Sequence, residues 1–127
     1  MPLSQDAVNN HAHTIRMEGA ALYRVAIRRI EQAVRDILQE FGIAPGDLKQ
    51  AVFHQANGRI LSQVADRLGI GQEKLSSVIE QYGNTSSASL PIALDAAVQK
   101  GSVVSGDLVL LGSFGGGVTW GAGLLRW

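Results

Sequence analysis

Residues 48–68, LKQAVFHQANGRILSQVADRL, hold a strand and a helix in direct succession. The segment 48–54 is short and largely apolar, which is typical of a strand that is buried on both faces. A helix is predicted to begin at Asn57 or Gly58 and to end at Gly69, because apolar residues recur there at helical spacing: Ile60, Leu61, Val64, Ala65 and Leu68. A buried strand that leads into an amphipathic helix indicates an α/β layer architecture.

A longer helix is predicted upstream, from Arg16 to Phe41. Gly42 stands where a left-handed C-terminal cap belongs, and Pro45 prevents continuation. The residues at helical spacing that support it are Val25, Ile27, Ile30, Val34, Ile37, Leu38 and Phe41.

Downstream, residues 74–79 are compatible with a short strand or with an irregular connection. A third helix is predicted to end at Gly101, with Thr85 or Ser86 as its N-cap and Pro91 in its first turns. Two apolar runs, 107–111 and 118–127, are then expected to form an antiparallel pair of strands.

Composition places the chain among globular proteins. It has 127 residues, of which 46% are hydrophobic and 17% charged. We expect a polar lead-in at 1–15 and one domain at 16–127. Zero formal net charge gives no basic field for nucleic acid or an anionic membrane. No apolar run approaches the ~18 residues of a membrane span, and no secretory signal is recognisable, so a cytoplasmic location is the default expectation.

Three polar or glycine-rich segments follow predicted elements: 54–59 (HQANGR), 82–87 (YGNTSS) and 114–117 (FGGG). His54 ends a buried strand, which is where ligand sites form in α/β sheets. Each segment also has a purely structural interpretation. These are a hydrogen-bonded histidine at a strand end, an Asn-led turn with a helix cap, and a tight hairpin in which glycine allows close backbone approach.

Other kinds of site are not indicated. The chain has no cysteine, which excludes disulfides, thiolate metal sites and a cysteine nucleophile within it. His11 and His13 have no third ligand nearby in the sequence, so no metal site is expected. The glycine run precedes a strand, whereas glycine-rich phosphate loops precede a helix.

Taken together, HQANGRI, YGNTSSASLPIALDAAV and GSFGGGVTWG resemble the C-terminal part of β-ketoacyl-acyl-carrier-protein synthase III in order, spacing and neighbouring residues. The resemblance covers about residues 16–127. TWG after FGGG favours this branch over chalcone synthases, thiolases and HMG-CoA synthases. The resemblance implies the C-terminal half of a thiolase-like fold, with a mixed β-sheet packed by helices in α-β-α layers.

The family loads an acyl group from acyl-CoA onto a cysteine and condenses it with malonyl-acyl-carrier protein after decarboxylation. The resemblance implies that His54 and Asn84 donate hydrogen bonds to the enolate, with His54 neutral. It gives Gly116, together with Phe114 and Gly115, a backbone oxyanion contact. Asn57 matches a position that contacts pantetheine or CoA. No cofactor or metal is implied beyond the substrates.

Arg24, Arg59 and Arg67 match basic positions that dock the acidic carrier protein in the family. Asp66 stands where a basic residue often occurs, which would weaken that docking. The alternative for these arginines is a solvated helix face, since exposed charges contribute little to stability.

The family's nucleophilic cysteine belongs to an N-terminal half, which is absent here. The resemblance therefore implies a partner half that carries the cysteine, a homodimer in the complete enzyme, and no condensation by this chain alone. A truncated domain, a split-gene subunit and a standalone non-catalytic protein all fit. So do a carrier-protein or acyl-CoA binding module and a subunit of a polyketide-type condensing enzyme. The sequence does not specify which acyl starter is used, or whether the enzyme serves primary or secondary metabolism.

Overall fold

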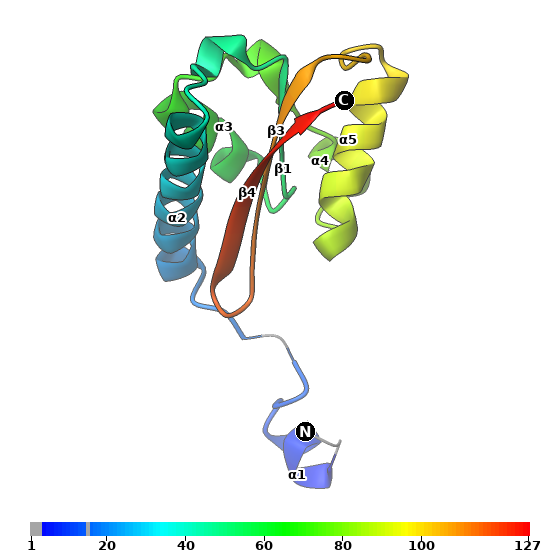
Figure 1. Cartoon of the computed structure of the whole chain (residues 1–127). Coiled ribbons are helices and arrows are strands. Elements are labelled where there is room, and N and C mark those ends of the chain that lie inside the picture. Colours follow the sequence, from blue (N-terminus) through cyan, green and yellow to red (C-terminus); the bar gives the residue numbers. More distant parts are fainter. Residues whose placement is uncertain (1–3, 15) are drawn as a thin grey trace.

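The computed structural model describes residues 4–14 and 16–127 (Figure 1). The principal elements follow in the order α1 (Gln5–Asn9), α2 (Gly19–Glu40), β1 (Gln50–Phe53), α3 (Gly58–Leu68), β2 (Leu75–Ser76), α4 (Ile79–Tyr82), α5 (Ser89–Gln99), β3 (Leu108–Gly115) and β4 (Thr119–Arg126). Short 3-10 turns at Pro45–Asp47, Gln72–Lys74 and Ser86–Ala88 link them.

One four-stranded sheet organises the chain in the order β2-β1-β3-β4. β1 runs parallel to both β2 and β3, and β3 pairs antiparallel with β4. Helices α2 and α3 lie on one face of this mixed sheet and α5 lies on the other (Figure 1). The expected α-β-α layering and mixed sheet are therefore confirmed.

The strand predicted at 48–54 is confirmed but is shorter, and the predicted helix is confirmed at both ends. All four residues of β1 are buried. Asn57 is the N-cap of α3, and its Oδ1 accepts a hydrogen bond from the Ile60 N–H at 3.0 Å. Gly69 ends the helix in the left-handed conformation, with φ +68°. The apolar stripe of α3 is buried throughout.

Helix α2 packs on the same face as α3 through Ile27, Ile30, Val34 and Leu38. It is shorter at both ends than the predicted helix from Arg16 to Phe41, and Glu18 and Phe41 are its flanking residues. Phe41 is 62% exposed, so its place in the predicted apolar stripe was wrong. Gly42 adopts the expected positive φ of +63°.

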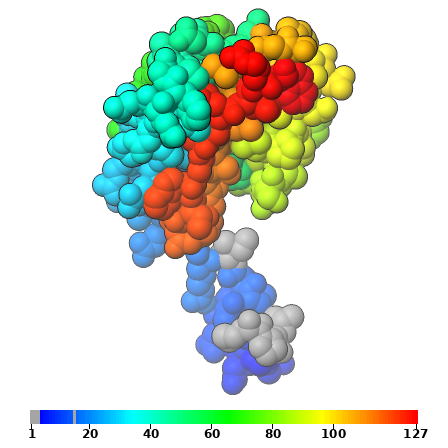
Figure 2. Space-filling view, viewed as in Figure 1, coloured from blue at the N-terminus to red at the C-terminus, as the bar shows by residue number. Residues whose placement is uncertain are grey.

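The β3–β4 hairpin is longer than the sequence predicted. β3 continues four residues past the expected end, Leu111, because β4 supplies partners as far as Gly115, which faces Thr119. Figure 2 shows β4 along the surface between the two helical layers. The glycine run therefore begins within a strand and does not lie wholly in a turn.

Two short helices were not predicted. Helix α1 lies within the expected lead-in, where the Ser4 Oγ accepts a hydrogen bond from the Ala7 N–H at 3.1 Å; Figure 1 shows it apart from the other elements. Helix α4 precedes Gly83. Segments of this length carry too little periodicity to be recognised from sequence.

Candidate active site

His54 leaves the sheet at the carboxyl end of β1. Its backbone N–H donates to the carbonyl oxygen of Gly112 at 2.8 Å, so the ring is carried at the edge shared by β1 and β3. The imidazole meets the ring of Phe114 edge-on, with centroids 5.3 Å apart and planes at 74°. A strand end and its neighbouring strand thus fix the position of the histidine.

A hydroxyl on the opposite helix holds the other side of the ring. Ser89, the first residue of α5, lies with its Oγ 2.6 Å from His54 Nδ1. The same oxygen accepts a hydrogen bond from the backbone N–H of Gln55 at 3.0 Å. Ser89 is only 1% exposed, so its side of the contact is shielded from solvent.

Gln55 supports this arrangement from a fully buried position. Its Nε2 donates to the carbonyl oxygens of Phe53, at 2.8 Å, and Ser76, at 3.2 Å, and its Oε1 accepts from the Val78 N–H at 3.0 Å. One side chain therefore ties β1 to β2 and to the start of α4. Its bonds are neutral and satisfied, as a buried amide requires.

Burial lowers the pKa of His54 below its ordinary value, because a charged imidazole loses hydration there. A hydrogen bond with the backbone of Ser86 opposes part of this effect. Both the direction and its cause favour the neutral ring. A neutral imidazole donates from one nitrogen and accepts at the other.

Asn84 reaches the same region from the loop after α4. Its Oδ1 accepts a hydrogen bond from the Ser86 N–H at 2.9 Å, in a turn where Gly83 has φ +64° and Ser86 has φ +57°. Thr85 Oγ1 is buried with no hydrogen-bond partner among the described residues. The N-cap position of α5 is Ala88, without a side-chain cap, so the predicted capping by Thr85 or Ser86 was wrong. With its oxygen engaged, Asn84 retains an NH₂ group that can donate.

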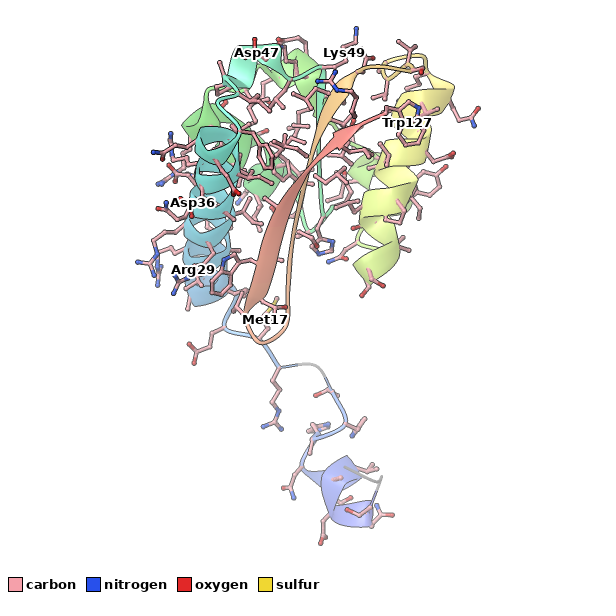
Figure 3. The ribbon with its side chains drawn as sticks, viewed as in Figure 1. Met17, Arg29, Asp36, Asp47, Lys49 and Trp127 are labelled. Carbon is pink, nitrogen blue, oxygen red and sulfur yellow. The ribbon has the colours of Figure 1, made fainter. Side chains whose placement is uncertain are left out.

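A cavity of about 710 Å³ brings the three sequence-predicted segments together. His54, Asn84, Phe114, Gly115 and Gly116 all line it. Trp120 of β4 also contributes, and the guanidinium of Arg29 lies 4.6 Å from the centre of the Trp120 ring. Figure 3 shows Arg29 on α2, beside β4. Uncharged donors and backbone amides at one cavity can stabilise a developing negative charge on oxygen.

Asn57 does not line this cavity. Its side-chain oxygen is committed to the cap of α3, which leaves its NH₂ group at the exposed start of that helix. Its predicted contact with pantetheine or CoA stays a prediction.

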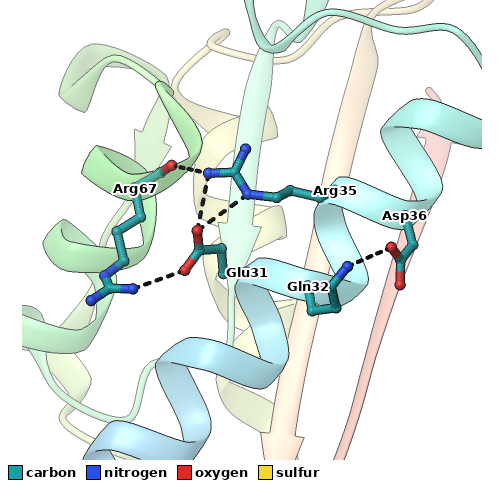
Figure 4. A network of polar contacts seen from close by, with 5 residues as sticks. All are labelled: Glu31, Gln32, Arg35, Asp36 and Arg67. Carbon is teal, nitrogen blue, oxygen red and sulfur yellow. Dashed lines mark hydrogen bonds and ion pairs between the residues drawn. The ribbon is translucent and has the colours of Figure 1, made fainter.

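The three arginines predicted for carrier docking are all exposed, but they differ in their surroundings. Arg24 and Arg67 line a second cavity, between α2 and α3, whereas Arg59 does not. Arg67 is engaged: its Nη1 lies 3.0 Å from Glu31 Oε2, and Arg35 bonds both Glu31 and the Arg67 carbonyl oxygen (Figure 4). The hydrogen bond from Arg67 is the main cause that lowers the pKa of Glu31. Docking by these arginines stays a prediction.

Two further observations concern residues 4–14 and 16–127 only. No three histidine, aspartate or glutamate side chains gather closely enough to hold a metal ion. None of the helices is long and apolar enough to cross a membrane.

Comparison with known proteins shows the family of the chain. Residues 38–127 match the family model described as 3-oxoacyl-[acyl-carrier-protein] synthase III C terminal. The chain belongs to this family. The β-ketoacyl-[acyl-carrier-protein] synthase III of Desulfotalea psychrophila is 52% identical over 113 residues, which are 89% of this chain and 35% of that protein.

Solved structures of the same family share the fold. The Aquifex aeolicus synthase III is 47% identical with a TM-score of 0.87, over 89% of this chain and 37% of that one. The Pseudomonas aeruginosa synthase III is 38% identical with a TM-score of 0.89, over 100% and 38%. The chain therefore spans little more than a third of the length of the relatives it matches, and corresponds to their C-terminal part.

Sequence reasoning did not single out Ser89 or assign Gln55 a role. Both lie inside the quoted motifs, but their type alone shows no role. What distinguishes them is burial, which the structure shows and the sequence does not. The serine at the start of a helix and the glutamine beside a strand-end histidine are both buried.

Proposed function

We propose that this chain is the enolate-stabilising part of a β-ketoacyl-acyl-carrier-protein synthase III. The observation that carries the proposal is the meeting of His54 and Asn84 at one cavity beside the Phe114–Gly116 backbone. The Ser86 N–H holds Oδ1 of Asn84, which leaves its NH₂ group to donate. Ser89 holds Nδ1 of His54, and a substrate oxygen would replace the Ser86 backbone as the other hydrogen-bond partner of the ring.

In the proposed reaction, the C–C bond to the carboxylate of malonyl-acyl-carrier protein breaks and CO₂ leaves. The bonding electrons remain as an enolate, whose negative charge develops on the thioester oxygen. Hydrogen bonds from His54 and Asn84 strengthen as that charge develops, and each is expected to contribute about 2.7–4 kcal/mol to the transition state. The enolate carbon then attacks the acyl thioester and releases a cysteine thiolate.

The backbone N–H of Gly116 is proposed to donate to the oxygen of the acyl thioester during that attack. Gly116 lines the cavity, and an added Cβ there would meet nothing within 4 Å, so a substrate can approach the backbone closely. The cysteine must come from another polypeptide segment, because this chain has none. We propose that a segment equivalent to the N-terminal part of the relatives supplies it, and that the carrier protein docks near Arg24.

The test joins the N-terminal region of a full-length relative to this chain and measures CO₂ release from malonyl-acyl-carrier protein with acetyl-CoA. His54→Ala and Asn84→Ala are each expected to lower the rate about 10²–10³-fold. His13→Ala, which changes an exposed histidine outside the cavity, serves as the matched control. An unchanged rate in His54→Ala would disprove the donor assignment. Turnover by this chain alone would disprove the need for a cysteine-bearing segment.

A further inference from the structure

The contact between Ser89 and His54 decides which nitrogen of the ring carries the proton. A serine hydroxyl has one hydrogen to donate and two lone pairs that accept. Ser89 Oγ has two polar neighbours among the described residues, His54 Nδ1 and the Gln55 backbone nitrogen. A backbone N–H can only donate, so it uses one lone pair of Ser89 and offers nothing to the hydroxyl hydrogen.

The hydroxyl hydrogen of Ser89 needs an acceptor within the protein. At 1% exposure it has no access to water, and a buried donor left without a partner costs about 1–3 kcal/mol. If His54 Nδ1 carried a hydrogen of its own, Ser89 would have to accept twice and leave its own hydrogen without a partner. If Nδ1 carries no hydrogen, the Gln55 N–H donates to Ser89 Oγ and the Ser89 O–H donates to His54 Nδ1. Every one of these groups then has a hydrogen-bond partner.

We propose that Ser89 is a positioning residue that holds His54 in the tautomer with its hydrogen on Nε2. This inference rests on the proposed function, in which His54 is a hydrogen-bond donor. With Nδ1 occupied by Ser89, the Nε2–H is the ring's only donor, so in this tautomer it also serves the backbone of Ser86 until a substrate oxygen binds. Ser89 thus acts on the reaction through His54 without itself contacting the substrate.

Around the ring, hydrogen bonds and not nearby charges decide which nitrogen carries the hydrogen. No charged side chain lines the main cavity or the small apolar cavity that Ile30, Phe53, Ile60 and Phe114 form on the other side of the ring. Protonation of His54 would place hydrogens on both nitrogens and remove the acceptor of Ser89. The same contact therefore favours the neutral ring.

The test is NMR of the two ring nitrogens of His54 in the chain as it stands, at a pH where the ring is neutral. Wild type is expected to show a hydrogen-bearing Nε2 and a bare Nδ1. Ser89→Ala is expected to move the tautomer ratio roughly five- to tenfold toward Nδ1–H, the factor for one lost hydrogen bond. Ser89→Thr, which keeps a hydroxyl, should preserve the wild-type pattern. Ser62→Ala removes an exposed serine of α3 and should also preserve it.

Two results would overturn the proposal. One is a wild-type His54 with its hydrogen on Nδ1. This measurement uses wild type alone, so it can be made even if Ser89→Ala does not fold. The other is a folded Ser89→Ala protein whose tautomer ratio equals that of wild type. Neither depends on turnover, so the result is separable from the rate of the assembled enzyme. An unchanged rate in His54→Ala would instead reject the proposed function.

Discussion

Two polar clusters connect the elements around α3, and they differ in their access to water. At the end of β1, His54, Gln55 and Ser89 form a cluster of neutral hydrogen bonds, in which Gln55 and Ser89 are buried. On the outer flank, Glu31 pairs with Arg35 and Arg67, whose side chains are 52% and 51% exposed. Water can replace a partner on the flank but not at the buried Gln55 and Ser89. The buried cluster, with no net charge, should therefore contribute more to stability and to the geometry of the site.

The largest effect is expected for Gln55→Leu. The change removes three hydrogen bonds and leaves the buried Val78 N–H without its acceptor, so the free energy of unfolding should fall by about 3 kcal/mol. Urea titration followed by circular dichroism measures it. Gln99→Leu, at an exposed position of α5, is the matched control and should change little. Equal losses in the two variants would remove the distinction between buried and exposed amides.

A slightly smaller effect is expected for Gly112→Ala. A Cβ at Gly112 would overlap the ring of Phe53, which is buried in the core beneath His54. Overpacking of this kind costs about 1–3 kcal/mol, measurable as a lower urea midpoint. Gly123→Ala on β4 meets nothing within 4 Å and should leave the midpoint unchanged or raise it. A stable Gly112→Ala variant would show that the strand end is loosely packed.

A third effect concerns pH. The pKa of His54 is lowered in the folded chain, so the unfolded chain binds a proton first as pH falls. The stability that the neutral ring contributes is full above the unfolded pKa of about 6.5 and is lost as pH falls toward the lower folded pKa. Urea titrations between about pH 7.5 and about pH 5 should show this loss in wild type and less of it in His54→Gln. Identical pH profiles would contradict it.

The smallest effect is expected on the exposed flank. Glu31→Gln removes the acceptor of two partly solvated ion pairs and should lower the free energy of unfolding by about 0.5–1 kcal/mol. The contribution is present above the ordinary carboxyl range and is lost as pH falls through the lowered pKa of Glu31. Adding salt should reduce the difference between wild type and variant, and a salt-independent difference would argue against ion pairing.

Most of the fold follows from local patterns. The stripes of α2 and α3, the buried β1 and the glycine caps at Gly42 and Gly69 each depend on residues within a few positions of one another. The extension of β3 through Gly115 could not be predicted in this way, because a strand made of serine, phenylalanine and glycine is set by its partner β4.

In the site, too, some residues follow from local sequence patterns and others depend on the fold. Recognisable motifs named His54, Asn84 and Gly116, and the topology brings them to one cavity. The bond from Ser89 to His54 spans 35 positions and was invisible to any local pattern. Arg67 has the residue type that predicts docking, yet its pairing with Glu31 depends on how α2 and α3 cross.

The Ser89–His54 contact also has a meaning for folding kinetics. It closes a loop of 35 positions between the end of β1 and the first turn of α5, and chain entropy opposes the closure of such a loop. The imidazole can reach its final state only once α5 has docked on the sheet. During refolding, the His54 ring signal should therefore appear together with the docking of α5 on the sheet.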